Sequence, residues 1–239
     1  MPGERTGPEG RRVSNRLLLA LPNREFRALR PALELRKLKH QEVLHEPHVK
    51  VDRVYFPNAG LIALVIAMAN GKTVEAGVLG NEGIVGLEGM LGLQRGPLRE
   101  IVQAEGTAYC VSAPRLERLV RRFPTLLVRF SRFAIVNRMQ ISQTAACNRL
   151  HDVESRLARW LLLLQDRVNS AFIPVTHEFV ATMLGTDRGS VTHAAGILQK
   201  HKIIEYTRGS LRILNRKELE RFSCECYALI REYNSDLIG

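Results

Sequence analysis

The sequence of 239 residues predicts an α+β fold with three parts, and three observations support this prediction. Residues 43–111 are rich in Val, Ile, Tyr and Phe and contain turn dipeptides, which is typical of short antiparallel strands in a sandwich or roll. Residues 125–149, which follow Pro124, contain neither Gly nor Pro and have apolar residues at helical spacing. Residues 173–214 contain two short helical patterns joined by a glycine, followed by a strand, a turn and a second strand.

The composition indicates a globular chain long enough for two domains, with 45% hydrophobic and 25% charged residues. The longest apolar run, residues 61–69, is too short to cross a bilayer. Residues 1–15 are polar and rich in Gly and Pro, so we expect a disordered N-terminus without a secretion signal. The four cysteines are scattered, which argues against a disulfide framework and favours the cytoplasm.

The formal net charge of +11 suggests a polyanionic partner. However, residues 151–239 contain 12 Lys and Arg against 11 Asp and Glu, so their net charge is only 12 − 11 = +1. Most of the excess therefore lies in residues 1–150. Basicity alone does not establish nucleic-acid binding.

The N-terminal half is predicted to contain short helices and then a β domain. Apolar residues at helical spacing over 16–38, interrupted by Pro22 and Pro31, predict two or three short helices. Asn70-Gly71 is the strongest hairpin signal, since a type I′ turn needs positive φ at both central residues. A further short helix is expected from Pro114. We expect residues 16–123 to form a sensor domain.

The long helical pattern over 124–149 has an apolar stripe that one domain alone would not cover. We therefore predict that it pairs with its twin in a second chain. The alternative is a helix packed lengthwise on its own β domain. The residues expected at the dimer contact are Leu126, Phe130, Phe133, Asn137 and Ile141.

Residues 173–214 have the pattern of two helices and a wing within a C-terminal domain over 150–239. Thr176 is expected to cap a helix over 177–184, and Gly185 to supply a left-handed turn. Asp187 is expected to cap a second helix that ends near Lys200. In that helix the predicted buried residues are Val191, Ala194, Ala195 and Leu198, and Ala194-Ala195-Gly196 would permit close approach of the first helix.

The outer face of the second helix carries small and hydrogen-bonding residues at its N-terminal end, as a helix in the major groove requires. With the strand–turn–strand segment, it predicts a winged helix-turn-helix that binds double-stranded DNA. The alternative is a helical hairpin used only for packing. The predicted DNA-binding residues are Thr176, Asp187, Arg188, Gly189, Ser190, Thr192, His193, Lys200, Arg208 and Arg212, the last two suited to phosphate contact.

The segments DVESRLARWLLLL, VTHEFVATMLGTDRGSVTHAAGILQ and IEYTRG resemble the C-terminal domain of the Crp/Fnr family. VYFPNAGLIALV and GNEGIVG resemble the N-terminal β-roll of that family, which is cyclic-nucleotide-binding-like. The resemblance implies an effector-sensing β-roll, a dimerisation helix and a winged helix that binds palindromic DNA. It also implies that Arg188 contacts a base. Gly189 and His193 depart from the cyclic-AMP type, so we expect a different operator.

The resemblance raises the question of the effector. Family members of the cyclic-nucleotide type hold the phosphate with a cassette that ends in Arg-Ser or Arg-Thr, whereas this chain has Arg95-Gly96-Pro97. A hydroxyl and a backbone donor are thereby lost. We expect an unidentified effector, or none, in place of a cyclic nucleotide. The alternative is a nucleotide-dependent regulator that uses Glu82 and Arg95. The candidate effector pocket comprises Gly80, Glu82, Gly83, Arg95, Ile141 and Ser142, although the glycines are equally explained as turns.

No metal or other cofactor is predicted. An N-terminal cysteine cluster for iron–sulfur binding is missing, because the first cysteine is Cys110. Cys224-Glu225-Cys226 lacks zinc-site spacing and is assigned to packing. His40, His45 and His48 are interpreted as solvated loop residues rather than metal or haem ligands.

The sequence contains no catalytic motif, and His151-Asp152 has no nucleophile motif nearby, so we expect a regulator rather than an enzyme. A remote alternative is an adaptor whose winged helix binds protein. RNA polymerase would be a further partner if the protein activates transcription.

Overall fold

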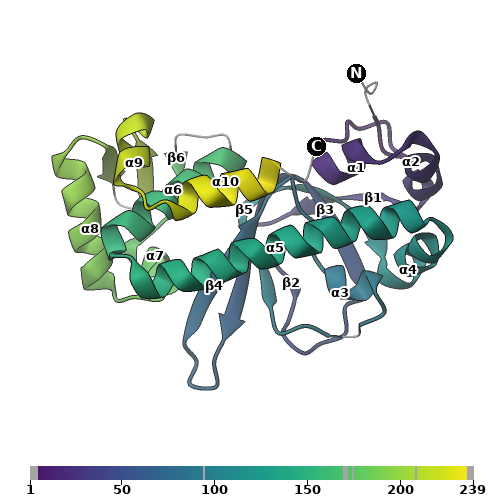
Figure 1. Ribbon diagram of the computed structural model, residues 1–239, viewed down its shortest axis with the longest axis horizontal. Coiled ribbons are helices and arrows are strands. Elements are labelled where there is room, and N and C mark those ends of the chain that lie inside the picture. Colours follow the sequence, from purple (N-terminus) through teal and green to yellow (C-terminus); the bar gives the residue numbers. More distant parts are fainter. Residues whose placement is uncertain (1–4, 94, 169–171, 174, 208, 236–239) are drawn as a thin grey trace. The chain divides into compact units, whose positions relative to one another are not determined.

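The computed structural model describes residues 5–93, 95–168, 172–173, 175–207 and 209–235 (Figure 1). The chain divides into two compact units, which we describe separately. Unit 1 comprises the chain up to Leu64, Leu79–Arg138 and the end from Asn234, and unit 2 comprises Val65–Val78 and Met139–Tyr233.

The elements are α1 (Arg16–Ala20), α2 (Asn23–Leu29), the 3₁₀ helix η1 (Arg30–Ala32), β1 (Glu34–Leu38), β2 (Val43–His45), β3 (Arg53–Ala67), β4 (Thr73–Leu79), α3 (Leu87–Met90), β5 (Arg99–Ser112), α4 (Ala113–Arg122), α5 (Pro124–Leu150), α6 (Val153–Val168), β6 (Phe172–Ile173), α7 (His177–Leu184), α8 (Arg188–Lys200), β7 (Ile204–Thr207), β8 (Ser210–Ile213), α9 (Arg216–Phe222) and α10 (Cys226–Ser235).

The predicted α+β class is confirmed, with a sheet in the N-terminal half ordered β1-β5-β3-β4 and β2 paired with β5. One part of the prediction is wrong, because residues 34–38 form a strand and not a helix. They pair antiparallel with β5 from Glu34↔Cys110 to Leu38↔Gly106. The pairing partner lies far along the chain, so the local apolar spacing alone did not indicate it.

The Asn70-Gly71 hairpin is confirmed, since β3 and β4 are neighbours joined by residues 68–72. Gly71 has φ of 80°, but Asn70 is not among the residues with positive φ. The expected type I′ geometry is therefore wrong. Instead, the side chain of Asn70 accepts a hydrogen bond of 3.0 Å from the backbone N–H of Lys72, which closes the turn by another route.

The N-terminal segment from Arg5 to Asn15 is ordered, which corrects the expectation of disorder; residues 1–4 lie outside the described part of the chain. The guanidinium of Arg5 donates a 2.7 Å hydrogen bond to the Leu18 carbonyl and also binds the Leu21 carbonyl. Val13 is 1% exposed. Composition indicated a polar tail, but the Arg5 side chain binds carbonyl groups in and just after α1, and the Val13 side chain is buried.

The N-terminal half of α5 packs within unit 1. Leu126, Phe130 and Phe133 are at most 1% exposed, and the Phe130 ring lies 5.8 Å from that of Phe56 on β3. Their stripe therefore belongs to the core of its own unit, as expected for the alternative in which the helix packs lengthwise on its own β domain.

Within the described ranges, no helix has the length and apolar character needed to span a membrane.

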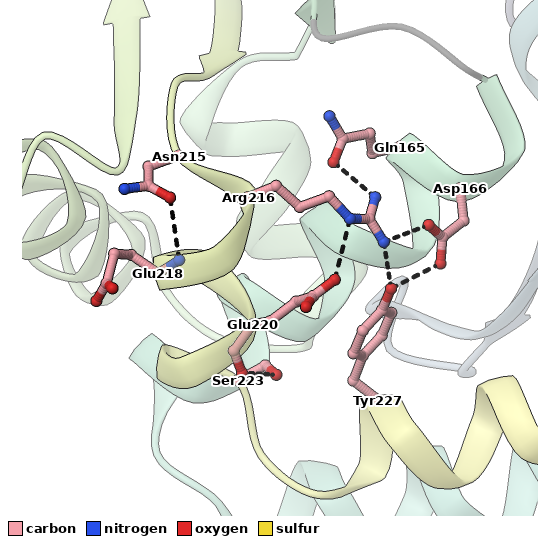
Figure 2. A network of polar contacts seen from close by, with 8 residues as sticks. All are labelled: Gln165, Asp166, Asn215, Arg216, Glu218, Glu220, Ser223 and Tyr227. Atoms are coloured by element: carbon pink, nitrogen blue, oxygen red, sulfur yellow. Dashed lines mark hydrogen bonds and ion pairs between the residues drawn. The ribbon is translucent and has the colours of Figure 1, made fainter.

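Unit 2 is built around α6, whose residues Leu157, Trp160, Leu161 and Leu164 are at most 1% exposed. This helix packs against α7, α8 and α9. At its C-terminal end the guanidinium of Arg216 on α9 binds Asp166 at 2.6 Å and Gln165 at 2.8 Å on α6 (Figure 2). The same guanidinium contacts the Tyr227 hydroxyl of α10, so that the Arg216 side chain connects α9 to both α6 and α10.

The first prediction concerns Asn15, which is completely buried. Its amide donates to the carbonyls of Pro57 and Gly83 at 3.0 and 2.9 Å, and its oxygen caps α1. Asn15→Ala removes the side-chain donor to both buried carbonyls and the cap of α1, so we expect the free energy of unfolding to fall by about 2–4 kcal/mol. Denaturant titration measures this loss. The exposed neighbour Arg16→Ala is the control and should change stability by less than about 0.5 kcal/mol; equal effects would contradict the assigned role of Asn15.

Candidate DNA-binding surface

The two helices of the predicted helix-turn-helix are present with the expected bounds and caps. Thr176 accepts a hydrogen bond of 3.1 Å from the Phe179 N–H at the start of α7. Gly185 has φ of 62° after α7, where a side chain would be strained. Asp187 caps α8, because its carboxylate accepts from the N–H and the hydroxyl of Ser190 at 2.9 and 2.6 Å.

Helix α8 has one buried and one exposed face. Val191, Ala194, Ala195 and Leu198 are at most 1% exposed, as predicted. Gly196 is exposed, and a Cβ built on it meets no atom within 4 Å. The expectation that Gly196 permits close approach of the first helix is therefore wrong. Arg188, Gly189, Thr192 and His193 lie exposed at the N-terminal end of α8.

His177 links α7, α8 and the wing, a role that the sequence analysis missed. Its Nδ1 lies 3.0 Å from the hydroxyl of Thr192, and its ring lies 4.1 Å from that of Tyr206 on β7. Burial and the nearby charge of Arg188 both lower the pKa of His177, which favours the neutral ring at pH 7. The only signal in the sequence was its position one residue after the helix cap.

The remaining predicted DNA-binding residues occupy distinct positions. His193 lies 4.0 Å from Glu154 of α6, and its side chain is 75% exposed. Lys200 is exposed at the last residue of α8, and Arg212 is exposed on β8. Arg208 lies outside the described residues. Thr176, Asp187 and Ser190 are occupied by capping, so they position the helices.

The wing is a three-stranded sheet ordered β6-β8-β7. Strands β7 and β8 pair from Ile204↔Ile213 to Thr207↔Ser210, close to the predicted strand–turn–strand. Strand β6, whose two residues pair with Leu211 and Arg212, was not predicted, because so short a strand has no recognisable periodicity in the sequence.

The part of the candidate effector pocket that lies in unit 1 comprises Gly80, Glu82, Gly83 and Arg95. Glu82 is 5% exposed and accepts a hydrogen bond of 3.2 Å from the Gly80 N–H, while the Gly83 N–H donates to the Gly80 carbonyl. These contacts form a turn. Arg95 is exposed, and Ile141 and Ser142 belong to unit 2.

The described part of unit 1 contains a separate cavity of about 160 Å³. It is lined mostly by leucines together with Glu88, Glu100 and Asn137, the last of which was predicted at the dimer contact. Burial raises the pKa of Glu88. Ligand pockets commonly measure about 300–1,000 Å³. A small cavity with two carboxyl groups does not suit a phosphate.

Two of the three histidines in residues 40–48, His40 and His45, have separate surroundings. His40 Nδ1 lies 2.9 Å from the Gln103 carbonyl, and His45 binds Glu100 in a buried pair. His45 is therefore not solvated, contrary to expectation. Burial opposes protonation of His45, but the hydrogen bond and charge of Glu100 outweigh it and raise its pKa.

The cysteines of unit 2 form a group that the sequence analysis did not anticipate. Cys147 on α5 and His151 just after it meet Cys224, which precedes α10, and Cys226, the first residue of α10; their ligand atoms all lie within 4.8 Å of one another. Cys147 Sγ lies 3.5 Å from Cys224 Sγ, and Cys226 Sγ lies 3.6 Å from His151 Nδ1. Cys224 and Cys226 pack in a buried cluster with Cys147, as expected. The expectation that this chain has no metal site is not confirmed, because the four residues could hold a metal ion.

The electrostatics of this group favour a thiolate at Cys147. The hydrogen bond from Cys224 lowers the pKa of Cys147, burial opposes this effect, and the charge of Arg159 adds to the lowering. The contact with Cys147 raises the pKa of His151, which favours the protonated ring when no metal is bound.

Comparison with known proteins agrees with this geometry. Residues 155–222 match the Crp-like helix-turn-helix domain. No curated protein matches the chain by sequence.

Among solved structures, FixK2 from Bradyrhizobium japonicum has a TM-score of 0.69 at 13% identity and covers 80% of this chain and 98% of its own. The c-di-GMP-responsive global regulator CLP from Xanthomonas campestris has a TM-score of 0.67 at 14% identity, with coverage of 80% and 99%. A CRP-family transcriptional regulator from Thermus thermophilus has a TM-score of 0.65 at 18% identity, with coverage of 79% and 96%.

The fold and the surface together define a winged helix-turn-helix protein with an N-terminal β domain. Residues 155–222 match a Crp-like helix-turn-helix domain and the fold is that of solved Crp/Fnr regulators, so the resemblance seen in the sequence is confirmed.

The second prediction follows from the cavity in unit 1. A screen of cyclic mononucleotides should leave the melting temperature unchanged, because the cavity is small and bears carboxyl groups. A ligand at a hundredfold excess over its Kd would add about 2.7 kcal/mol to the free energy of unfolding. For a chain of this size, that raises the melting temperature by roughly 5–11 °C. Differential scanning fluorimetry detects such a rise. A rise that Arg95→Ala abolishes would restore the nucleotide-dependent alternative.

Proposed function

We propose that this protein is a transcription regulator that binds palindromic operators as a homodimer, with α8 in the major groove. The observation that carries the proposal is the orientation of α8. Its apolar face is buried, and its N-terminal end exposes Arg188, Gly189 and Thr192. The match of residues 155–222 to a Crp-like helix-turn-helix domain supports the same assignment. The proposal includes no catalytic step.

The residues on this surface divide by their chemistry. Arg188 has a planar group that matches the O6 and N7 acceptors of guanine in the major groove. Gly189 leaves room for close approach of the backbone. Lys200 and Arg212 are suited to phosphates, which set the register without determining sequence. The hydrogen bonds of His177 to Thr192 and of Asp187 to Ser190 position this surface.

The dimer is proposed to form through the exposed side of α5. Val128, Ile135 and Met139 are 59%, 48% and 36% exposed. Steps of seven and four residues place these three side chains on one face of the helix, and Ser142 and Ala146 continue that face with small residues. This face is distinct from the buried stripe of Leu126, Phe130 and Phe133. The second copy of the chain would cover it and so set two α8 helices about 34 Å apart.

The third prediction tests Arg188. On an operator selected with the wild-type protein, Arg188→Ala should weaken binding by about 1–3 kcal/mol and relax the choice at one base pair per half-site. Lys200→Ala is the matched control, since loss of a phosphate contact weakens binding to all sequences and reduces the salt slope by about 0.9. Fluorescence anisotropy over a salt series measures both effects. If both variants weaken every DNA sequence equally, Arg188 does not contact a base; if neither matters, the winged helix binds another partner such as a protein.

The fourth prediction tests the dimer. The double change Ile135→Glu and Met139→Glu places like charges opposite one another across the contact, so we expect a folded monomer with operator affinity reduced by well over tenfold. Sedimentation velocity at micromolar concentration measures the oligomeric state. Ala145→Glu, exposed about 100° around the helix from Ala146, should remain dimeric. A monomeric wild type would contradict the proposed assembly.

A further inference from the structure

The group formed by Cys147, His151, Cys224 and Cys226 has the composition of a closed metal site. Three thiols and one imidazole meet, and the three cysteine side chains are buried. Cys147 lies in the last turn of α5 and His151 directly follows that helix, and the His151 N–H donates a hydrogen bond of 3.1 Å to the Cys147 carbonyl, which keeps the two residues on one side. Cys224 lies in the connection between α9 and α10, and Cys226 is the first residue of α10.

We propose that these four residues bind one Zn²⁺ ion in a tetrahedral Cys₃His site. The distances carry the proposal. In a tetrahedron with Zn–S of about 2.3 Å and Zn–N of about 2.0–2.1 Å, two sulfurs lie about 3.8 Å apart, and a sulfur and a nitrogen about 3.6 Å apart. The observed values are 3.5 Å for Cys147 and Cys224 and 3.6 Å for Cys226 and His151.

The surrounding residues support the ligands in the manner of a metal site. Glu225 Oε1 lies 3.2 Å from Nε2 of His151, so a carboxylate orients the ring with Nδ1 toward the sulfurs. The Gln143 amide donates a hydrogen bond of 3.1 Å to Cys226 Sγ. Three thiolates around Zn²⁺ leave one net negative charge, and Arg159, which is 3% exposed, supplies a compensating positive charge that acts on Cys147.

The position of the Cys224–Cys226 segment does not depend on the metal alone. Arg216 on α9 binds both Asp166 of α6 and the Tyr227 hydroxyl of α10 (Figure 2). The Ser223 hydroxyl donates a hydrogen bond of 2.8 Å to the Glu220 carbonyl. These contacts lie immediately before and after the two cysteines. The ligands are therefore held close together before an ion arrives, which reduces the conformational entropy that binding costs.

The arrangement fits a single zinc ion better than its competitors. Iron–sulfur clusters distribute their ligands over two or more irons, whereas these ligand atoms all lie within 4.8 Å of one another. A disulfide needs sulfurs about 2.05 Å apart, and all four cysteines are free. Four protein ligands leave no open position for a substrate, so the site would stabilise the junction of α5 and α10.

The fifth prediction tests the site in the full-length protein, purified without a histidine tag. Inductively coupled plasma mass spectrometry should find one zinc per chain. Exchange with Co²⁺ should produce thiolate-to-cobalt charge-transfer absorption and the intense visible bands of tetrahedral cobalt. Chelation should lower the melting temperature by on the order of 10 °C, and added zinc should restore it.

Two variants and one control complete the test. Cys147→Ser should lose the zinc, whereas Cys110→Ser, a buried cysteine of unit 1, should retain it. Because Cys147→Ser removes a buried group and could unfold the protein, Glu225→Gln is included: its side chain is 69% exposed, and zinc affinity should fall about 10–100-fold with the fold intact. Protein that takes up neither zinc nor cobalt, that contains iron and sulfide, or that keeps its zinc in Cys147→Ser would overturn the proposal.

Discussion

The packing of α8 against α6 and α7 is the constraint on which the DNA-binding surface depends. Val191, Ala194, Ala195 and Leu198 are buried almost completely, so the rotation of α8 about its own axis is fixed. The opposite face, with Arg188 and Thr192, must then point outward. A larger side chain at Ala194 or Ala195 would overpack this contact and shift the helix. The capping residues add local precision, because Asp187 fixes where α8 begins and Gly185 fixes the angle at which the chain enters it.

A second set of contacts holds the C-terminal helices of unit 2, and it is polar rather than apolar. Arg216 binds carboxylate, amide and phenol groups on two other helices, and the cysteine–histidine group lies beside this network in sequence. Buried or half-buried polar groups of this kind tolerate few alternative arrangements, since each lost partner leaves a desolvated group. Directional bonds therefore add to the buried Leu219 and Ile230 in positioning α9 and α10, whereas α8 is positioned mainly by packing.

Features with local causes could be predicted from the sequence, and features with distant causes could not. Helix α7, the Gly185 turn and the start of α8 follow from caps and a left-handed glycine within a few residues. By contrast, β1 is a strand because β5 pairs with it, and Arg5 is ordered because it binds the Leu18 carbonyl. Apolar periodicity in α5 could not distinguish a stripe covered by its own unit from one available to a partner. The cysteine group remained hidden because its two ligand pairs lie 77 residues apart, from Cys147 to Cys224.

The central claim is that Arg188 at the start of α8 contacts a guanine edge in the major groove. The most direct measurement is a double-mutant cycle between protein and DNA, in which 7-deazaguanine removes the N7 acceptor at each guanine of the operator in turn. We predict one guanine per half-site at which the modification weakens the wild-type protein but has little further effect on Arg188→Ala. Equal losses for both proteins at every guanine would contradict the account.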